Sequence, residues 1–355
     1  MARGNSTLGS SRRGPAPGVV HVPASVAGTI AAVVLAALIW AGSDGLRTFD
    51  SALVGYATAV VFLAFGVTYR YVVWTQSPPA RRYLVEGWRA FGSVRNFARF
   101  PALVPRQLVS SLALQTFLRP RGIGRWLAHQ SLFWGVIGAT AITFPLVFGW
   151  IAFVDAPDDR YRLVLFGFET FTFDPYAWWA WLMFHGLDVT AVLVIAGAAF
   201  FLWRRFRDRE ATTGQRLGYD FVPLIALVAI SVTGLLLTFS SLLLDGAGYG
   251  FLTVLHMACV VLSLVFIPFG KFFHVIQRPA SVGVEVYKMT TLERDGAHAC
   301  RRCGEPLEGA AFVRDLERTM DELELGFSGW VETCPRCKRL ERGAAYLREV
   351  KRGFS

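Results

Sequence analysis

Residues 250–279 read GFLTVLHMACVVLSLVFIPFGKFFHVIQRP, an apolar run that ends in a basic segment. A helix needs about 20 mainly apolar residues to cross the hydrocarbon core of a bilayer. Lys271 and Arg278 mark the expected membrane surface at the end of this run. The stretch therefore predicts a spanning helix over roughly 250–275, with His256 near its start and His274 near its end.

Five further apolar segments of similar length lie at roughly 25–42, 52–74, 127–153, 177–203 and 220–244. The whole chain of 355 residues is 54% hydrophobic and only 17% charged, which argues against an ordinary soluble globule. We predict an all-α transmembrane helical bundle with six spanning helices.

The connections between these segments differ in charge. Residues 76–126 carry nine arginines and one acid, Glu86, whereas residues 155–176 are rich in aspartate and glutamate. Because arginine-rich connections face the cytoplasm, the pattern predicts a multi-pass protein of the inner (cytoplasmic) membrane with both termini cytoplasmic. In 76–126 the arginines alternate with apolar residues, which favours interfacial cytoplasmic helices on a lipid surface over nucleic-acid binding.

Composition divides the chain into three parts. Residues 1–24 are rich in Gly, Ser, Arg and Pro and are predicted to be a disordered arm. Residues 25–279 form the predicted six-helix membrane domain, and residues 280–355 a small cytoplasmic domain of mixed polarity. Within the latter, residues 309–326 have the apolar spacing of a helix.

The C-terminal part contains two CxxC pairs. Cys300 and Cys303 form CRRC, Cys334 and Cys337 form CPRC, and 30 residues separate the pairs. Two such pairs supply four thiolates to one tetrahedral metal ion, so we predict a zinc-ribbon-like site. One redox-active iron is the alternative, because ligand geometry does not distinguish these metals.

Four of the six histidines lie in the predicted spanning helices: His129, His185, His256 and His274. Ionisable side chains at membrane depth are rare and costly, which makes each a functional candidate. The helix directions place His129 and His274 near the inner surface, and His185 and His256 near the outer one. On one continuous helix, His256 and His274 would share a face about 27 Å apart.

Two pairs of histidines at different depths suit bis-histidine ligation of two b-type haems, an inner and an outer one. In this interpretation Gly135, Gly138 and Gly186 let the backbone approach a flat macrocycle, and Arg125 pairs with a haem propionate. Histidines bonded to neighbours in the core are the simpler alternative. A dinuclear metal site is less favoured, since no carboxylate or cysteine cluster joins either pair.

RWLAHQSLFWGVIGAT at 125–140, LVSSLALQTFLRP before it and KFFHVIQRP at 271–279 resemble membrane dihaem cytochrome b proteins. These are related to the nitrate reductase gamma subunit and to membrane subunits of heterodisulfide-reductase-type complexes. The resemblance covers about 50–280 and implies haem ligation by His129, His185, His256 and His274. It also implies electron exchange with menaquinone or ubiquinone and with a cytoplasmic iron–sulfur or molybdenum oxidoreductase.

Asp188 follows His185 by three residues and lies on nearly the same helix face. Its carboxylate is predicted to accept a proton from quinol or to hydrogen-bond the His185 imidazole. The sequence thus favours an electron-transfer subunit of a membrane oxidoreductase complex, with no catalytic residue of its own. The alternative function is a haem-free membrane sensor or transporter with a zinc-ribbon docking domain.

Overall fold

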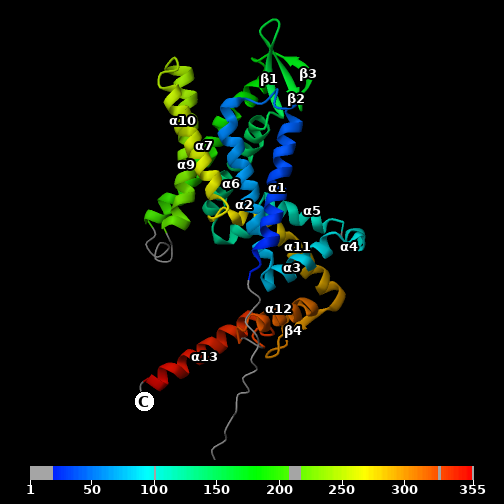
Figure 1. Cartoon of the computed structure of the whole chain (residues 1–355). Helices are drawn as coiled ribbons and strands as arrows, with labels where there is room; N and C mark the ends of the chain where they lie inside the picture. The colour runs from blue at the N-terminus through cyan, green and yellow to red at the C-terminus, as the bar shows by residue number, and fades with distance from the viewer. Residues whose placement is uncertain (1–18, 100, 208–216, 327–328, 354–355) are drawn as a thin grey trace, which may run out of the picture.

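The computed structural model describes residues 19–99, 101–207, 217–326 and 329–353. Six of its helices are long and apolar enough to span a membrane, which confirms the predicted fold class (Figure 1). These are α1 (His21–Gly42), α2 (Val54–Thr75), α6 (Ile123–Val147), α7 (Trp178–Arg207), α9 (Val222–Leu243) and α10 (Tyr249–Phe266). Residues 1–18 of the predicted disordered arm lie outside the described part, and residues 21–24 form the first turn of α1.

The spanning helices contact one another in a circuit. Starting from α2, each next helix packs on the one before it in the order α10, α9, α7 and α6, and α6 touches α2 again. The first helix, α1, packs on the outside of α2. Consequently α9 lies between α7 and α10, an arrangement that the sequence does not predict.

Small residues allow the closest of these contacts, between α6 and α7. A Cβ at Gly135 would lie 2.9 Å from the Thr190 carbonyl oxygen, and one at Gly138 would lie 2.8 Å from the Thr190 methyl group. A Cβ at Gly186 would lie 2.8 Å from Ile142. These glycines therefore let two helices approach closely, as small residues commonly do in membranes. The expectation that they make room for a macrocycle is wrong.

The sixth spanning helix is shorter than predicted. α10 ends at Phe266, a turn follows, and a separate helix, α11, runs over Phe273–Asp295. Pro268 lies in that turn, where its ring and missing N–H oppose continuation of the helix. His256 and His274 therefore belong to different helices, and the spacing of about 27 Å on one face does not apply.

The connection between α6 and α7 contains an antiparallel sheet that the sequence analysis did not predict. Strands β1 (Ile151–Ala156), β2 (Arg160–Leu165) and β3 (Phe168–Phe173) pair in that order. Phe166 and Gly167, with φ of +50° and +80°, form the two-residue turn between β2 and β3. Positive φ at both positions matches the right-handed twist of a hairpin. The sheet caps the bundle at the end away from α11 (Figure 1).

Short helices fill the arginine-rich connection, as predicted, but the first of them contacts protein. They are α3 (Pro78–Phe91), α4 (Val94–Arg99), α5 (Leu103–Gln107), a π-helical turn (Leu108–Ala113) and the 3-10 helix η3 (Thr116–Arg121). Much of the apolar face of α3 packs on α11, where Ala90, Val286 and Tyr287 form a buried cluster. Gly87 and Gly283 mark the crossing, since a Cβ on either would lie within 3 Å of the other's backbone.

The C-terminal part folds beside α3 and α11. It consists of the hairpin β4 (Ala297–Ala299) and β5 (Pro306–Gly309), then α12 (Ala310–Glu322), which is the helix predicted within 309–326, and α13 (Pro335–Gly353). α11 runs through the predicted domain boundary at 279/280, so no linker separates the two parts there. Arg82 of α3 bonds Thr319 and Glu322 of α12, which ties this domain to the membrane helices.

Candidate metal centre and membrane histidines

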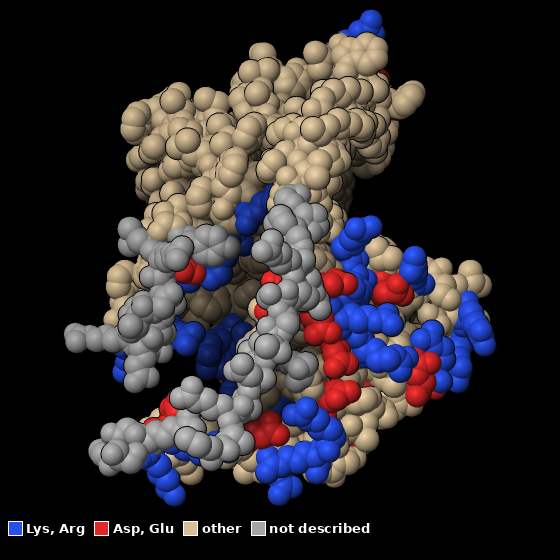
Figure 2. All heavy atoms as spheres, turned by 60° about the horizontal axis from the view of Figure 1, so that its bottom comes forward, with Lys and Arg blue, Asp and Glu red and all other residues tan. Residues whose placement is uncertain are grey.

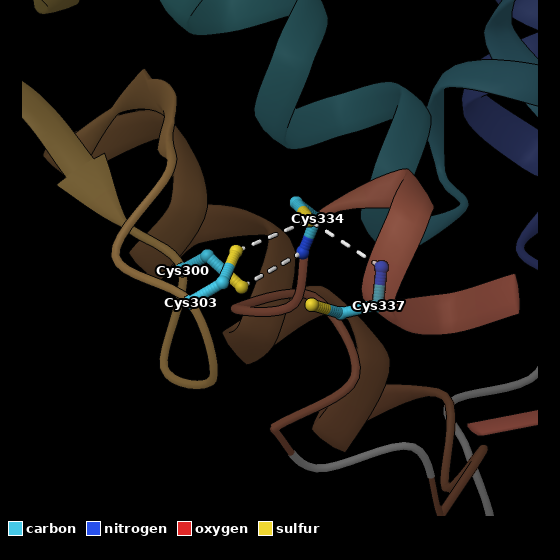
Figure 3. Close-up of side chains that lie close together, drawn as sticks. All are labelled: Cys300, Cys303, Cys334 and Cys337. Atoms are coloured by element: carbon cyan, nitrogen blue, oxygen red, sulfur yellow. Dashed lines mark hydrogen bonds between the residues drawn. The ribbon is translucent and has the colours of Figure 1, made fainter. Parts of the chain in front are cut away.

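Four cysteines gather in the C-terminal domain (Figure 3). The sulfur atoms of Cys300, Cys303, Cys334 and Cys337 all lie within 4.8 Å of one another, and those of Cys303 and Cys334 are 3.7 Å apart. Four thiolates about 2.3 Å from one zinc ion would lie about 3.8 Å from each other. The arrangement could hold one tetrahedrally coordinated metal ion, as the sequence predicts.

The backbone around each pair places the sulfurs. Cys300 follows β4, and its amide N–H donates to the Glu305 carbonyl across the turn. Gly304 has φ of +74°, a conformation that glycine adopts without a Cβ penalty. Cys334 directly precedes Pro335, the first residue of α13, so the second pair lies at a helix N-terminus, which favours negatively charged thiolates.

Backbone amides already donate to two of the sulfurs. The amide of Cys334 lies 3.3 Å from the Cys300 sulfur, and the amide of Cys337 lies 3.4 Å from the Cys334 sulfur. The donation from Cys334 is the main reason why the pKa of Cys300 is lowered to about 6. Burial raises the pKa of Cys337, so without a cation the four thiols would not all ionise together. A bound metal cation supplies the missing positive charge.

His129 and His274, the predicted inner pair, are brought close together although they lie on α6 and α11. Lys271 is common to their surroundings, because it lines one cavity together with His129 and its carbonyl group contacts His274. The Nδ1 atom of His129 is buried and has no hydrogen-bond partner among the described residues. His274 Nδ1 lies 2.6 Å from the Lys271 carbonyl oxygen, to which it can donate. A ring nitrogen anchored in this way leaves Nε2 available for a metal.

His185 and His256, the predicted outer pair, both contact α9. His185 Nδ1 lies 3.1 Å from the Asp188 carboxylate, which accepts a hydrogen bond of 2.7 Å from the Thr238 hydroxyl. His256 Nδ1 lies 2.9 Å from the Thr233 hydroxyl. In the packing circuit α9 stands between α7 and α10, and no described hydrogen bond joins the two imidazoles directly. Asp188 lies at hydrogen-bonding distance from His185, as one of the two predictions for it requires, whereas its role toward quinol stays a prediction.

A cavity of about 340 Å³ adjoins His129 and is the part of the site that the sequence analysis missed. It is lined by Leu118, Arg121, Arg125, His129, Phe201, Arg204, Arg205 and Lys271. The arginines at the ends of the apolar segments were the available signal. The positive-inside pattern was sufficient to explain why so many arginines lie on one side of the membrane. The sequence does not show that four of them line the same cavity.

Three of the four membrane histidines therefore have Nδ1 in a hydrogen bond, and the fourth has a buried Nδ1 without a partner. The ring nitrogens that remain, Nε2 of these three and Nδ1 of His129, are the atoms that a metal ion or a haem iron could bind. No protein-family model, curated protein or solved structure matches the chain, so its own residues carry the functional argument.

Proposed function

We propose that the chain is a dihaem b-type cytochrome subunit of a membrane oxidoreductase complex. The observation that carries the proposal is the buried Nδ1 of His129, which has no hydrogen-bond partner among the described residues. A buried polar atom without a hydrogen bond is costly, and a bound ligand relieves that cost. His129 and His274 would hold the inner haem, and His185 and His256 the outer one.

Bound haem would supply one-electron chemistry at these positions. The protein would hold the histidine rings in a fixed orientation toward the haem iron. The Lys271 carbonyl, the Asp188 carboxylate and the Thr233 hydroxyl each lie at hydrogen-bonding distance from an Nδ1 atom and so orient the ring. Such partners also raise the basicity of the ligating nitrogen. The apolar surfaces of the six helices would keep the site in the lipid phase.

The partners follow from the same proposal. Quinone would exchange electrons from the lipid side, and an iron–sulfur or molybdenum oxidoreductase would dock in the cytoplasm. Basic side chains, with acidic ones between them, gather on the face made by α3–α5 and the C-terminal domain (Figure 2). By the positive-inside rule this face and both termini would be cytoplasmic, and the membrane would be the inner membrane.

The cysteine site would bind zinc and act structurally. α11 has 23 residues, which corresponds to about 35 Å of helix between the His274 end and the end that leads to the cysteines. Efficient single-step electron transfer requires much closer centres. A structural ion instead fixes the β4–β5 hairpin to the start of α13, and zinc is the usual occupant of four thiolates.

The test is a reduced-minus-oxidised absorbance spectrum of the purified full chain. We expect b-type bands, and His274→Ala should remove about half of the haem because only the inner ligand pair is broken. His298→Ala is the matched control, since His298 lies in β4 outside the membrane helices and should leave the bands unchanged. A chain without b-type bands, under conditions that retain haem in a control cytochrome, would contradict the proposal and favour the haem-free sensor or transporter.

A further inference from the structure

The cavity beside His129 is unusually rich in positive charge. It lies where the 3-10 helix η3 leads into α6, where α7 ends, and where the turn between α10 and α11 passes. Of the eight described residues that line it, five are arginine or lysine. Figure 2 shows the face to which these elements belong, with some basic side chains set back in a recess.

One acid in the neighbourhood, Asp220, is already engaged. Its carboxylate lies 2.7 Å from Lys271 Nζ, and its backbone carbonyl accepts a hydrogen bond of 2.8 Å from Arg205. Arg205 also lies over the ring of Phe221, 5.0 Å from its centroid. These contacts hold two of the cations in place and engage the Asp220 carboxylate.

No carboxylate among the described residues pairs with Arg121 or Arg125. Further positive charge lies beside them on α11. Burial and the charge of Arg121 lower the pKa of Arg278, whose guanidinium lies 4.2 Å from the centroid of the Phe117 ring. Like charges held together in a partly enclosed site create a field that attracts an anion.

The position of the cavity indicates which anion. It lies at the ends of two spanning helices, the depth at which lipid headgroups meet water, and Leu118 and Phe201 give it apolar walls. We propose that it binds the phosphate of an anionic phospholipid headgroup. Guanidinium groups match phosphate oxygens with paired hydrogen bonds, and a phosphate accepts more of them than a carboxylate does. Basic pockets between spanning helices bind such headgroups.

This proposal does not depend on haem. Phosphate could also come from solution, and haem carboxylates would compete for the same arginines. The experiment therefore measures lipid, inorganic phosphate and haem on the same samples. The full chain is placed in nanodiscs with phosphatidylglycerol or with phosphatidylcholine alone, and the lipid that remains after detergent extraction is counted by native mass spectrometry.

The variant is Arg121→Gln with Arg125→Gln. The control is Arg339→Gln with Arg342→Gln on exposed positions of α13, which removes the same charge elsewhere. Two basic residues near a membrane surface together raise the affinity for anionic lipid by about thirtyfold. We expect phosphatidylglycerol binding to weaken by about that factor in the cavity variant and to stay unchanged in the control. Arg121→Lys with Arg125→Lys keeps the charge, so its affinity for phosphatidylglycerol should lie between those of the cavity variant and the control. This variant replaces the glutamine variant in the comparison if the latter unfolds.

Three results would overturn the proposal. Equal loss in both double variants would mean diffuse attraction to the whole basic face. Inorganic phosphate binding in phosphatidylcholine discs, sensitive to the cavity variant and competing with phosphatidylglycerol, would identify a soluble ligand. Loss of haem bands with unchanged lipid binding would mean that Arg121 and Arg125 hold haem carboxylates. The last result would leave the cytochrome function standing.

Discussion

The side chains of the candidate sites are oriented by hydrogen bonds to neighbouring groups. Cys300 and Cys334 each receive a backbone N–H from the second cysteine pair. His274 bonds the carbonyl of Lys271 three residues earlier, and His185 bonds Asp188 three residues later. Such local contacts fix a ligand's orientation before the ligand is bound, which lowers the entropy cost of binding.

The metal centre gives the first prediction at this scale. Cys337→Ser removes one of four thiolates, so the zinc content should fall from about one ion per chain to near zero. Elemental analysis by mass spectrometry measures the loss. Cys259→Ser is the matched control, because Cys259 lies on α10, away from the four-cysteine cluster. This variant should keep about one zinc ion per chain. Iron in place of zinc in the unaltered protein would refute the structural-zinc assignment.

At the scale of elements, α11 connects the two parts of the molecule. It begins beside the inner histidines, crosses α3 at Gly87 and Gly283, and ends at the cysteine hairpin. A second contact runs from the Tyr287 hydroxyl to the Asp315 carboxylate of α12, at 2.6 Å. Burial and this carboxylate raise the pKa of Tyr287, so the hydroxyl stays protonated and donates. A stable position for α11 therefore depends on packing on α3 and α12.

Gly283→Ala tests the helix crossing. The new methyl group would lie 2.9 Å from the backbone of Gly87, where neither helix can move without losing its packing. Overpacking of this kind costs about 1–3 kcal/mol, so the free energy of unfolding should fall by that amount. Gly343→Ala is the control: nothing lies within 4 Å of its Cβ, and alanine in an exposed helix stabilises by up to about 1 kcal/mol. Denaturant titration measures the free energy of unfolding of both variants. Amide hydrogen exchange then shows whether α3 and α11 lose protection in Gly283→Ala only.

At the scale of the whole molecule, the two ends of the helical bundle differ in both charge and secondary structure. The antiparallel sheet lies at one end, and the basic short helices with the C-terminal domain lie at the other (Figure 1). If all six candidate helices span a membrane, the chain returns to the side on which it started. If the arginine-rich connections also face the cytoplasm, the sheet lies on the opposite side of that membrane.

A protease site inserted at Asp158, in the exposed turn between β1 and β2, tests this orientation. In intact spheroplasts we expect external protease to cut this site and to spare an epitope attached to the C-terminus. Both should be cut after lysis. Cleavage of the epitope, with protection of the turn, in intact cells would show the opposite orientation.

By itself, the sequence determined the number of candidate spanning helices, the four cysteines that gather and the helix within 309–326, because these follow from length, periodicity and local spacing. It also contains two further signals, one for a helix end and one for a hairpin. Pro268 ends α10 before His274, and the Phe166–Gly167 turn lies between alternating segments that form a hairpin. The proline would have separated the two histidines onto different helices.

Only the tertiary structure decided which helices touch. It placed α9 between α7 and α10, packed α6 on α7 through glycines, and turned the apolar face of α3 toward α11. It also gathered Arg121, Arg125, Arg204 and Arg205 around one cavity. The physical reason is that lipid covers an apolar helix face as well as another helix does, so hydropathy predicts that a helix spans the membrane but not its neighbours. Those contacts are set by small residues and polar pairs from distant parts of the chain.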